Sequence, residues 1–276
     1  MLMNMNIAAA ALELVLPAGC AGCGDTDRRC SDGLCTPCRH ALAAAVPVSW
    51  QLFGPAGEVL PAFAAASYDG VVRSMLLEYK EHARLGLRHG LATCLLLSVI
   101  AALGADATVA PIAAADGGQR PLLLVPVPSA AATRRARGHD PVGALARIVA
   151  RQLRACAMAV DVCAPLRQSR PVADQSGLDV VARRANLAGA IEVSKPATVR
   201  GRRVIVVDDI VTTGVTALEA ARALTAAGAI VSAVAAVAAT VRRFPRSLPA
   251  PEPIDGSRPA GPMRPVVLVR GPPGSD

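Results

Sequence analysis

Aromatic residues are scarce in this 276-residue sequence, which has one Trp, two Tyr and three Phe. A groove for single-stranded nucleic acid relies on aromatic side chains that stack on bases, so a dedicated groove of that kind is disfavoured. Lysine is nearly absent as well, since Lys80 and Lys195 are the only two and the remaining basic residues are arginines. Charged residues make up 18% and hydrophobic residues 53%, which excludes disorder along the whole chain. The core must therefore be built mainly from Ala, Val, Leu and Ile.

Long apolar runs are missing too. The best candidate, 91–103, has thirteen residues, fewer than the ~18 to 20 that a membrane-spanning helix needs, so we expect a buried core helix there. The apolar stretch 8–16 precedes a Pro-Ala-Gly-Cys sequence like a lipoprotein cleavage site, but no basic residue precedes it and Glu13 lies inside it. We therefore expect a cytoplasmic protein without membrane insertion, in which thiols stay reduced.

Basic residues outnumber acidic ones by 29 to 21, which gives a formal net charge of +8. This charge favours anionic partners, whether phosphorylated ligands, nucleic acid or acidic lipids, and does not choose among them. Residues 244–276 are rich in Pro, Gly and Arg and are expected to be disordered. They form either a solvated tail or a basic arm that contacts nucleic acid.

Five of the eight cysteines lie in the first forty residues. Four of them form two C-x-x-C pairs separated by eleven residues: Cys20, Cys23, Cys35 and Cys38. Two such turns can place four thiolates around one tetrahedral Zn²⁺, and a site closed by four sulfurs is structural rather than catalytic. The alternative is a pair of redox dithiols. The fifth, Cys30, either replaces one ligand or simply lies in the intervening loop.

Strand-like and helical patterns alternate along the rest of the chain. The segment around 71–79 has apolar residues at helical spacing, and 204–207 is a continuous run of β-branched residues typical of a buried strand. The expected elements are helices around 71–79 and at 85–103, 141–156 and 218–227, strands at 121–128, 204–207 and 230–237, and a polar loop at 167–188. This alternation predicts a parallel sheet with helices on both faces.

The segment 204–216 carries the most informative chemistry. A strand end in a parallel sheet opens into the crevice where ligands bind, and a helix beginning near Val215 directs unpaired N–H groups to that crevice. Gly214 permits close approach of a phosphate, three hydroxyls add donors (Thr212, Thr213 and Thr216), and the adjacent carboxylates of Asp208 and Asp209 can accept hydrogen bonds from sugar hydroxyls. The pattern indicates a sugar-phosphate site. The alternative is a threonine-capped helix with two solvated acids.

This segment resembles the PRPP-binding signature of type I phosphoribosyltransferases. Several other features resemble the ComF (competence protein F) family: the two cysteine pairs, the Tyr-Asp-Gly sequence that leads to Lys80, the Val-Pro-Val-Pro sequence at 125–128, and residues 175–187. The features occur in the family's order and cover roughly residues 15–243. The signature alone indicates the superfamily, and the cysteine pairs upstream indicate the narrower family.

The resemblance implies an α/β, parallel-sheet type I phosphoribosyltransferase fold with a small N-terminal zinc-ribbon-like module. It implies PRPP bound with Mg²⁺ and displacement of pyrophosphate by an unknown acceptor. Asp208 and Asp209 would contact the ribose hydroxyls and the bend at 212–216 the 5-phosphate. Further PRPP contacts would come from arginines of a pyrophosphate turn, Arg134, Arg135 and Arg137, and of a mobile loop at 168–187, Arg183 and Arg184.

The chain departs from the family's Arg-Gly-Phe-Asn-Gln pattern, because Arg137-Gly138 is followed by His139-Asp140-Pro141. Proline removes a backbone donor, which would weaken pyrophosphate binding. A second hypothesis is therefore a non-catalytic DNA-uptake factor that binds single-stranded DNA or a competence helicase. For either function we expect a cysteine module at 1–50, a phosphoribosyltransferase-like domain at 51–243, and the tail at 244–276.

Overall fold

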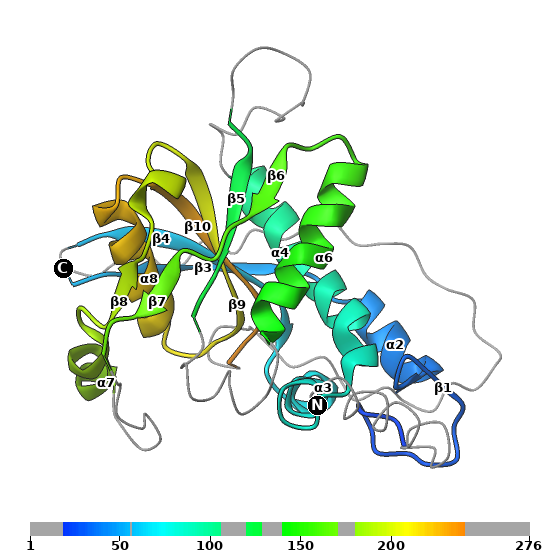
Figure 1. Cartoon of the computed structure of the whole chain (residues 1–276). Coiled ribbons are helices and arrows are strands. Elements are labelled where there is room, and N and C mark those ends of the chain that lie inside the picture. The colour runs from blue at the N-terminus through cyan, green and yellow to red at the C-terminus, as the bar shows by residue number, and fades with distance from the viewer. Residues whose placement is uncertain (1–18, 56, 106–119, 129–139, 171–179, 241–276) are drawn as a thin grey trace, which may run out of the picture.

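The computed structural model describes residues 19–55, 57–105, 120–128, 140–170 and 180–240. Its centre is a six-stranded sheet in the order β3-β4-β10-β9-β5-β6 (Figure 1). The strands are β3 (Val48–Phe53), β4 (Val59–Ser67), β5 (Leu122–Pro126), β6 (Val160–Val162), β9 (Arg203–Val211) and β10 (Ile230–Ala239). All neighbours from β4 to β6 are parallel, and β3 pairs antiparallel with β4 at one edge. The predicted parallel sheet is confirmed.

Helices cover both faces of this sheet. On one face lie α4 (Arg88–Ala105) and α6 (Pro141–Ala155), with α3 (Gly70–Glu81) and the short η1 (Leu85–Leu87) beyond the sheet edge, while α8 (Val215–Ala226) lies on the other face (Figure 1). Proline at the first turn and Asp140 at the N-cap begin α6, because the Asp140 carboxylate accepts a hydrogen bond from Gly143 N–H at 3.1 Å. The Asp140-Pro141 part of the departure from the family pattern is thus a helix start.

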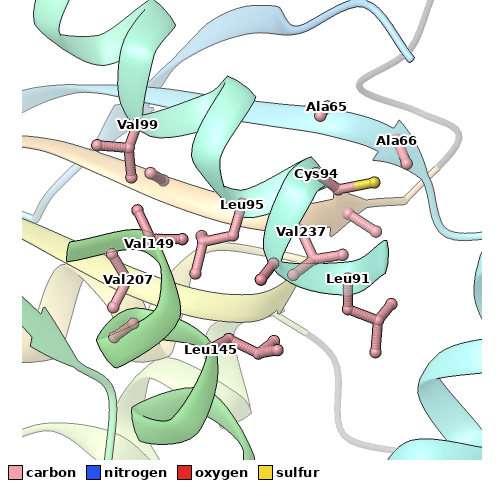
Figure 2. Close-up of a cluster of buried hydrophobic side chains, with 14 of the residues drawn as sticks. Ala65, Ala66, Leu91, Cys94, Leu95, Val99, Leu145, Val149, Val207 and Val237 are labelled. Carbon is pink, nitrogen blue, oxygen red and sulfur yellow. The ribbon is translucent and has the colours of Figure 1, made fainter. Parts of the chain in front are cut away.

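The main core lies between the sheet and the helix pair α4 and α6. Figure 2 shows Leu91, Leu95 and Val99 of α4 gathered with Leu145 and Val149 of α6 over the strands. By length and composition alone the segment Leu85–Ala105 could cross a membrane. One side of this segment, with Leu91, Leu95 and Val99, is fully buried against the sheet and α6 as predicted for a core helix, whereas Ile100 is 48% exposed. Alanine-rich strands let α4 approach the sheet closely.

The cysteine segment packs onto this same core. It consists of a short hairpin, β1 (Cys30–Ser31) and β2 (Leu34–Cys35), followed by α2 (Thr36–Ala43). Leu34 and Leu42 belong to one buried cluster with Met75 of α3 and Leu91 of α4. The cysteine segment and the sheet therefore share apolar packing, and the expected boundary at residue 50 falls inside β3.

Several elements differ from the sequence-based expectation. The stretch 167–188 contains ordered structure: β7 (Leu166–Gln168) pairs antiparallel with β8 (Ile191–Val193), and α7 (Val180–Leu187) precedes β8. With only eight residues, α7 is too short to show a clear helical periodicity in the sequence. Strand β9 continues four residues beyond 207, α8 begins three residues before 218, and a further 3₁₀ turn, η2 (Pro196–Thr198), precedes β9. The expected tail at 244–276 lies outside the described residues.

Candidate active site

The two predicted acids lie near the carboxyl end of β9, in the middle of the sheet. Asp208 and Asp209 are the sixth and seventh residues of the strand, and their side chains leave on opposite faces because strand residues alternate. Asp209 follows Val207 toward the α4 and α6 face, and Asp208 follows Val206 toward α8. Asp209 is 7% exposed and Asp208 is half-buried. At its carboxyl end, the strand thus presents one carboxylate to each face of the sheet.

Burial makes the acid pair electrostatically costly. Desolvation, and then the neighbouring charge of Asp209, raise the pKa of Asp208 well above its ordinary value. The Asp208 Oδ1 atom accepts a hydrogen bond from the Asp209 backbone N–H at 2.8 Å, which opposes this rise in part. Asp209 has a cation beside it, because Lys80 Nζ lies 2.6 Å from its Oδ2. A ligand that brings hydroxyls or positive charge to this edge would relieve the repulsion.

Helix α3 supplies that cation. Lys80, to which the Tyr-Asp-Gly segment leads, reaches Asp209 from the last turn of α3. The preceding residue, Tyr79, is 1% exposed and donates its hydroxyl to the Pro141 carbonyl at 3.3 Å. Burial raises the pKa of Tyr79 to about 12, so it stays neutral. These contacts tie the end of α3 to the start of α6.

The bend after β9 is built around a left-handed glycine that packs against β3. Gly214 adopts a left-handed φ of 81°, and a Cβ atom at this position would collide with the Leu52 side chain of β3. Gly214 also occupies the N-cap of α8, and having no side chain it cannot cap the helix itself. Val215 N–H donates to Thr213 Oγ1 at a long 3.5 Å. The first turn of α8, including Thr216, therefore follows the exposed Thr212 and a glycine that the Leu52 side chain approaches closely.

The predicted arginines are only partly placed. Arg183 and Arg184 lie on α7, where Arg183 is half-buried and Arg184 donates to the Phe53 carbonyl at 2.9 Å across to the β3–β4 hairpin. This contact holds α7 against the hairpin rather than against the acids. Arg134, Arg135 and Arg137 lie outside the described residues. The structure thus brings together the acids, the bend and Lys80, with α7 on the far side of the bend.

A cavity of about 700 Å³ lies beside the bend, between the β3–β4 hairpin, α7 and α8. Val215 and Arg184 contribute to its lining, and neither Asp208 nor Asp209 does. Its lining includes a satisfied ion pair, because buried Glu219 accepts from Arg222 at 2.7 and 2.8 Å. The cavity therefore lies beside the carboxyl end of β9 that carries Asp208 and Asp209, here named the acid edge, and is not part of it.

The four predicted cysteine ligands converge. The sulfur atoms of Cys20, Cys23, Cys35 and Cys38 all lie within 4.8 Å of one another. The Cys23–Cys35 sulfur separation of 3.8 Å matches the edge of a tetrahedron with metal–sulfur bonds of about 2.3 Å. A side chain on Gly22 would press on Cys38, with its Cβ 2.9 Å from the sulfur. The four residues can therefore hold a metal ion such as Zn²⁺.

Local hydrogen bonds prepare one thiolate for that role. Burial opposes ionisation of Cys20, but N–H groups led by that of Cys35, at 3.2 Å, lower the pKa of Cys20 to about 6. Gly22 N–H is a second donor to the same sulfur at 3.4 Å. Cys30 is exposed on β1, donates to the Arg28 carbonyl at 3.5 Å, and is not among the four clustered cysteines.

Comparison with known proteins places the acid edge in a recognised domain. Residues 143–249 match the family model described as phosphoribosyl transferase domain, a span that runs from α6 through β10 and includes both acids and the bend. Among solved structures, orotate phosphoribosyltransferase from Aeropyrum pernix aligns at 14% identity over 72% of this chain and 90% of that one, with a TM-score of 0.27. No curated protein matches the sequence. The matched domain and the mostly parallel sheet together confirm the predicted phosphoribosyltransferase-like α/β fold.

Proposed function

We propose that this protein binds PRPP with Mg²⁺ and transfers its phosphoribosyl group to an acceptor, with release of pyrophosphate. The observation that carries the proposal is the sequence of features at the end of β9. Two carboxylates at a parallel-sheet edge lead directly into a glycine bend and a helix start without a side-chain cap, inside the span that matches phosphoribosyl transferase domains. The order of the cysteine pairs and the later motifs supports the ComF family as the narrower assignment.

In this proposal the bend holds the 5-phosphate. The hydroxyls of Thr212, Thr213 and Thr216 and the first N–H groups of α8 provide donors, and the positive end of the helix favours the anion. Asp208 and Asp209 accept hydrogen bonds from the two vicinal ribose hydroxyls. Because the two carboxylates lie on opposite faces of β9, the ribose would straddle the strand end rather than rest on one face.

Each of the two acids also offers oxygen ligands to a hard divalent cation on its own face of β9. Mg²⁺ prefers oxygen ligands and typically binds through one or two carboxylates together with substrate phosphates. When bound with PRPP, it would neutralise charge on the leaving pyrophosphate. The protein's own part is to hold the ribose so that the bond from C1 to the pyrophosphate oxygen breaks as the acceptor's lone pair forms a new bond to C1.

The cysteine cluster supports a structural zinc site in the same proposal. Four sulfurs leave no open coordination position, so the ion would stabilise the fold and take no part in transfer. Reduced cysteines of this kind are in keeping with a cytoplasmic location.

Calorimetric titration with PRPP and Mg²⁺ tests the ligand directly. We expect the wild type to bind and the Asp208→Asn/Asp209→Asn variant to lose most of the heat, while a matched control, Asp161→Asn on the exposed side of β6, binds as the wild type does. Absence of binding by the folded wild type contradicts the proposal. Release of pyrophosphate with a panel of bases then tests transfer. Binding without release in every case favours the non-catalytic DNA-uptake role instead.

A further inference from the structure

A lysine from a distant helix is built into the acid edge. Lys80 Nζ lies 2.6 Å from Asp209 Oδ2, and the two side chains are only 21% and 10% exposed. Ion pairs on an open surface contribute little, because water screens them and both side chains lose freedom. At this exposure the carboxylate has little water of its own. The ammonium is therefore a main part of the charge environment of Asp209.

The position of this ammonium is set by packing. Lys80 follows Tyr79 in the last turn of α3, whose inner face is fixed by Met75 and Leu76, both fully buried. The Tyr79 hydroxyl reaches the Pro141 carbonyl at the start of α6. Because the helix cannot turn without exposing these side chains, Lys80 is presented to the acid edge as a preformed partner rather than as a mobile surface charge.

Lys80 is also the cation against which a divalent metal must compete. A metal ion binding at the edge would need the Asp209 carboxylate as a ligand, and a second positive charge a few ångströms from the ammonium is repelled. The Asp208 carboxylate alone offers one ligand on the other face of β9.

We propose that Lys80 is a positioning residue that occupies Asp209 in the ligand-free protein and keeps a divalent cation from binding to the acid pair before the phosphorylated sugar arrives. The proposal rests on the proposed function and names the order of events at its site. When the sugar binds, a ribose hydroxyl can donate to Asp209 while accepting from Lys80, so the lysine orients the hydroxyl rather than being expelled. The cation then enters with the pyrophosphate it neutralises.

Manganese titration without PRPP tests this order, with free Mn²⁺ followed by electron paramagnetic resonance in the zinc-loaded full chain. Mn²⁺ reports on oxygen ligands, as Mg²⁺ does, and is not drawn to the thiolates. We expect Lys80→Met to bind Mn²⁺ about tenfold or more tightly than the wild type, because a like charge has been removed from the edge. Lys80→Arg should restore weak binding, and Lys195→Met, which removes the exposed second lysine, should change nothing.

The double variant Lys80→Met/Asp209→Asn locates the effect. We expect the gained Mn²⁺ site to vanish in it, whereas a lysine with a merely structural role would leave Mn²⁺ binding unchanged throughout. If Lys80→Met fails to fold, a comparison of Mn²⁺ affinity between the wild type and Asp209→Asn still tests the proposal. If Lys80 already occupies Asp209, removal of that carboxylate should change Mn²⁺ affinity little. A wild-type affinity that falls tenfold or more in Asp209→Asn would overturn the proposal, and a smaller fall supports it.

A PRPP titration of the same proteins separates this inference from the proposed function. We expect Lys80→Met to bind PRPP with Mg²⁺ about tenfold more weakly, with recovery in Lys80→Arg, because the ribose hydroxyl loses its donor. A folded wild type that binds no PRPP refutes the proposed function, while the manganese contrast remains as the separate test of Lys80. Unchanged PRPP affinity in Lys80→Met would overturn the positioning role.

Discussion

Substitution of Gly214 by alanine tests how the bend is held against the rest of the sheet. Two costs add at this position. A side chain at a φ of 81° meets the left-handed penalty of about 1 to 2 kcal/mol, and its Cβ would collide with the Leu52 side chain on β3. Overpacking of this kind costs about 1 to 3 kcal/mol. We therefore expect Gly214→Ala to lower the free energy of unfolding by about 2 to 5 kcal/mol.

Gly201 supplies the matched control. It has a similar φ of 67°, but a Cβ atom added there would meet no atom of the described residues within 4 Å. Gly201→Ala should therefore show the backbone cost alone, about 1 to 2 kcal/mol. Urea unfolding of the two variants gives the difference as the Leu52 contribution. In the double variant Gly214→Ala/Leu52→Ala the two substitutions should be less costly together than their separate costs predict. Equal destabilisation by Gly214→Ala and Gly201→Ala would refute the collision with Leu52.

Three further predictions concern the acids, α3 and the cysteines. Because folding raises the pKa of Asp208, the fold loses stability as pH rises from the ordinary value of about 4 to the raised pKa. Asp208→Asn should match the wild type in melting temperature below pH ~4, exceed it increasingly above that pH, and keep a constant lead once Asp208 is ionised in the folded protein. A constant difference at every pH would contradict this. Tyr79→Phe should cost about 0.5 to 1.5 kcal/mol in urea unfolding through loss of the bond to Pro141, and no change would show that bond to be dispensable. Metal analysis should find about one zinc ion per chain, and the Cys38→Ser variant should lose the ion and melt at a lower temperature. A wild type that contains no metal and is no more stable than Cys38→Ser would contradict the zinc site.

The sequence predicted the elements whose signals are local. The run of β-branched residues before Asp208 indicates β9, and Asp140 with the following proline indicates the start of α6. The paired C-x-x-C turns indicate the cluster of four cysteines. Each of these follows from residues that are neighbours in the chain. The candidate site was predictable to the same extent, because the acids, threonines and Gly214 all lie in one continuous segment.

Other elements depended on contacts that the chain order hides. Strand β4 reads Ala-Phe-Ala-Ala-Ala and favours a helix by composition, and only its place between β3 and β10 makes it a strand. In β3 the alternation of Trp50 and Leu52 with polar residues is a local strand signal, although a short one. The ion pair of Lys80 with Asp209 and the contact of Gly214 with Leu52 join residues that are far apart in the sequence, so both depend on the assembled sheet.

The common packing of the cysteine segment and the sheet has a consequence for how this protein fails. Leu34 and Leu42 cover apolar side chains of α3 and α4, among them Met75 and Leu91. If the four cysteines bind zinc as proposed, a chain that never acquires the ion would uncover those helices and become a target for chaperones and proteases as a whole. Cells would then contain either the metal-loaded protein or almost no protein. A truncated variant that starts after α2 would aggregate rather than persist as a smaller folded protein.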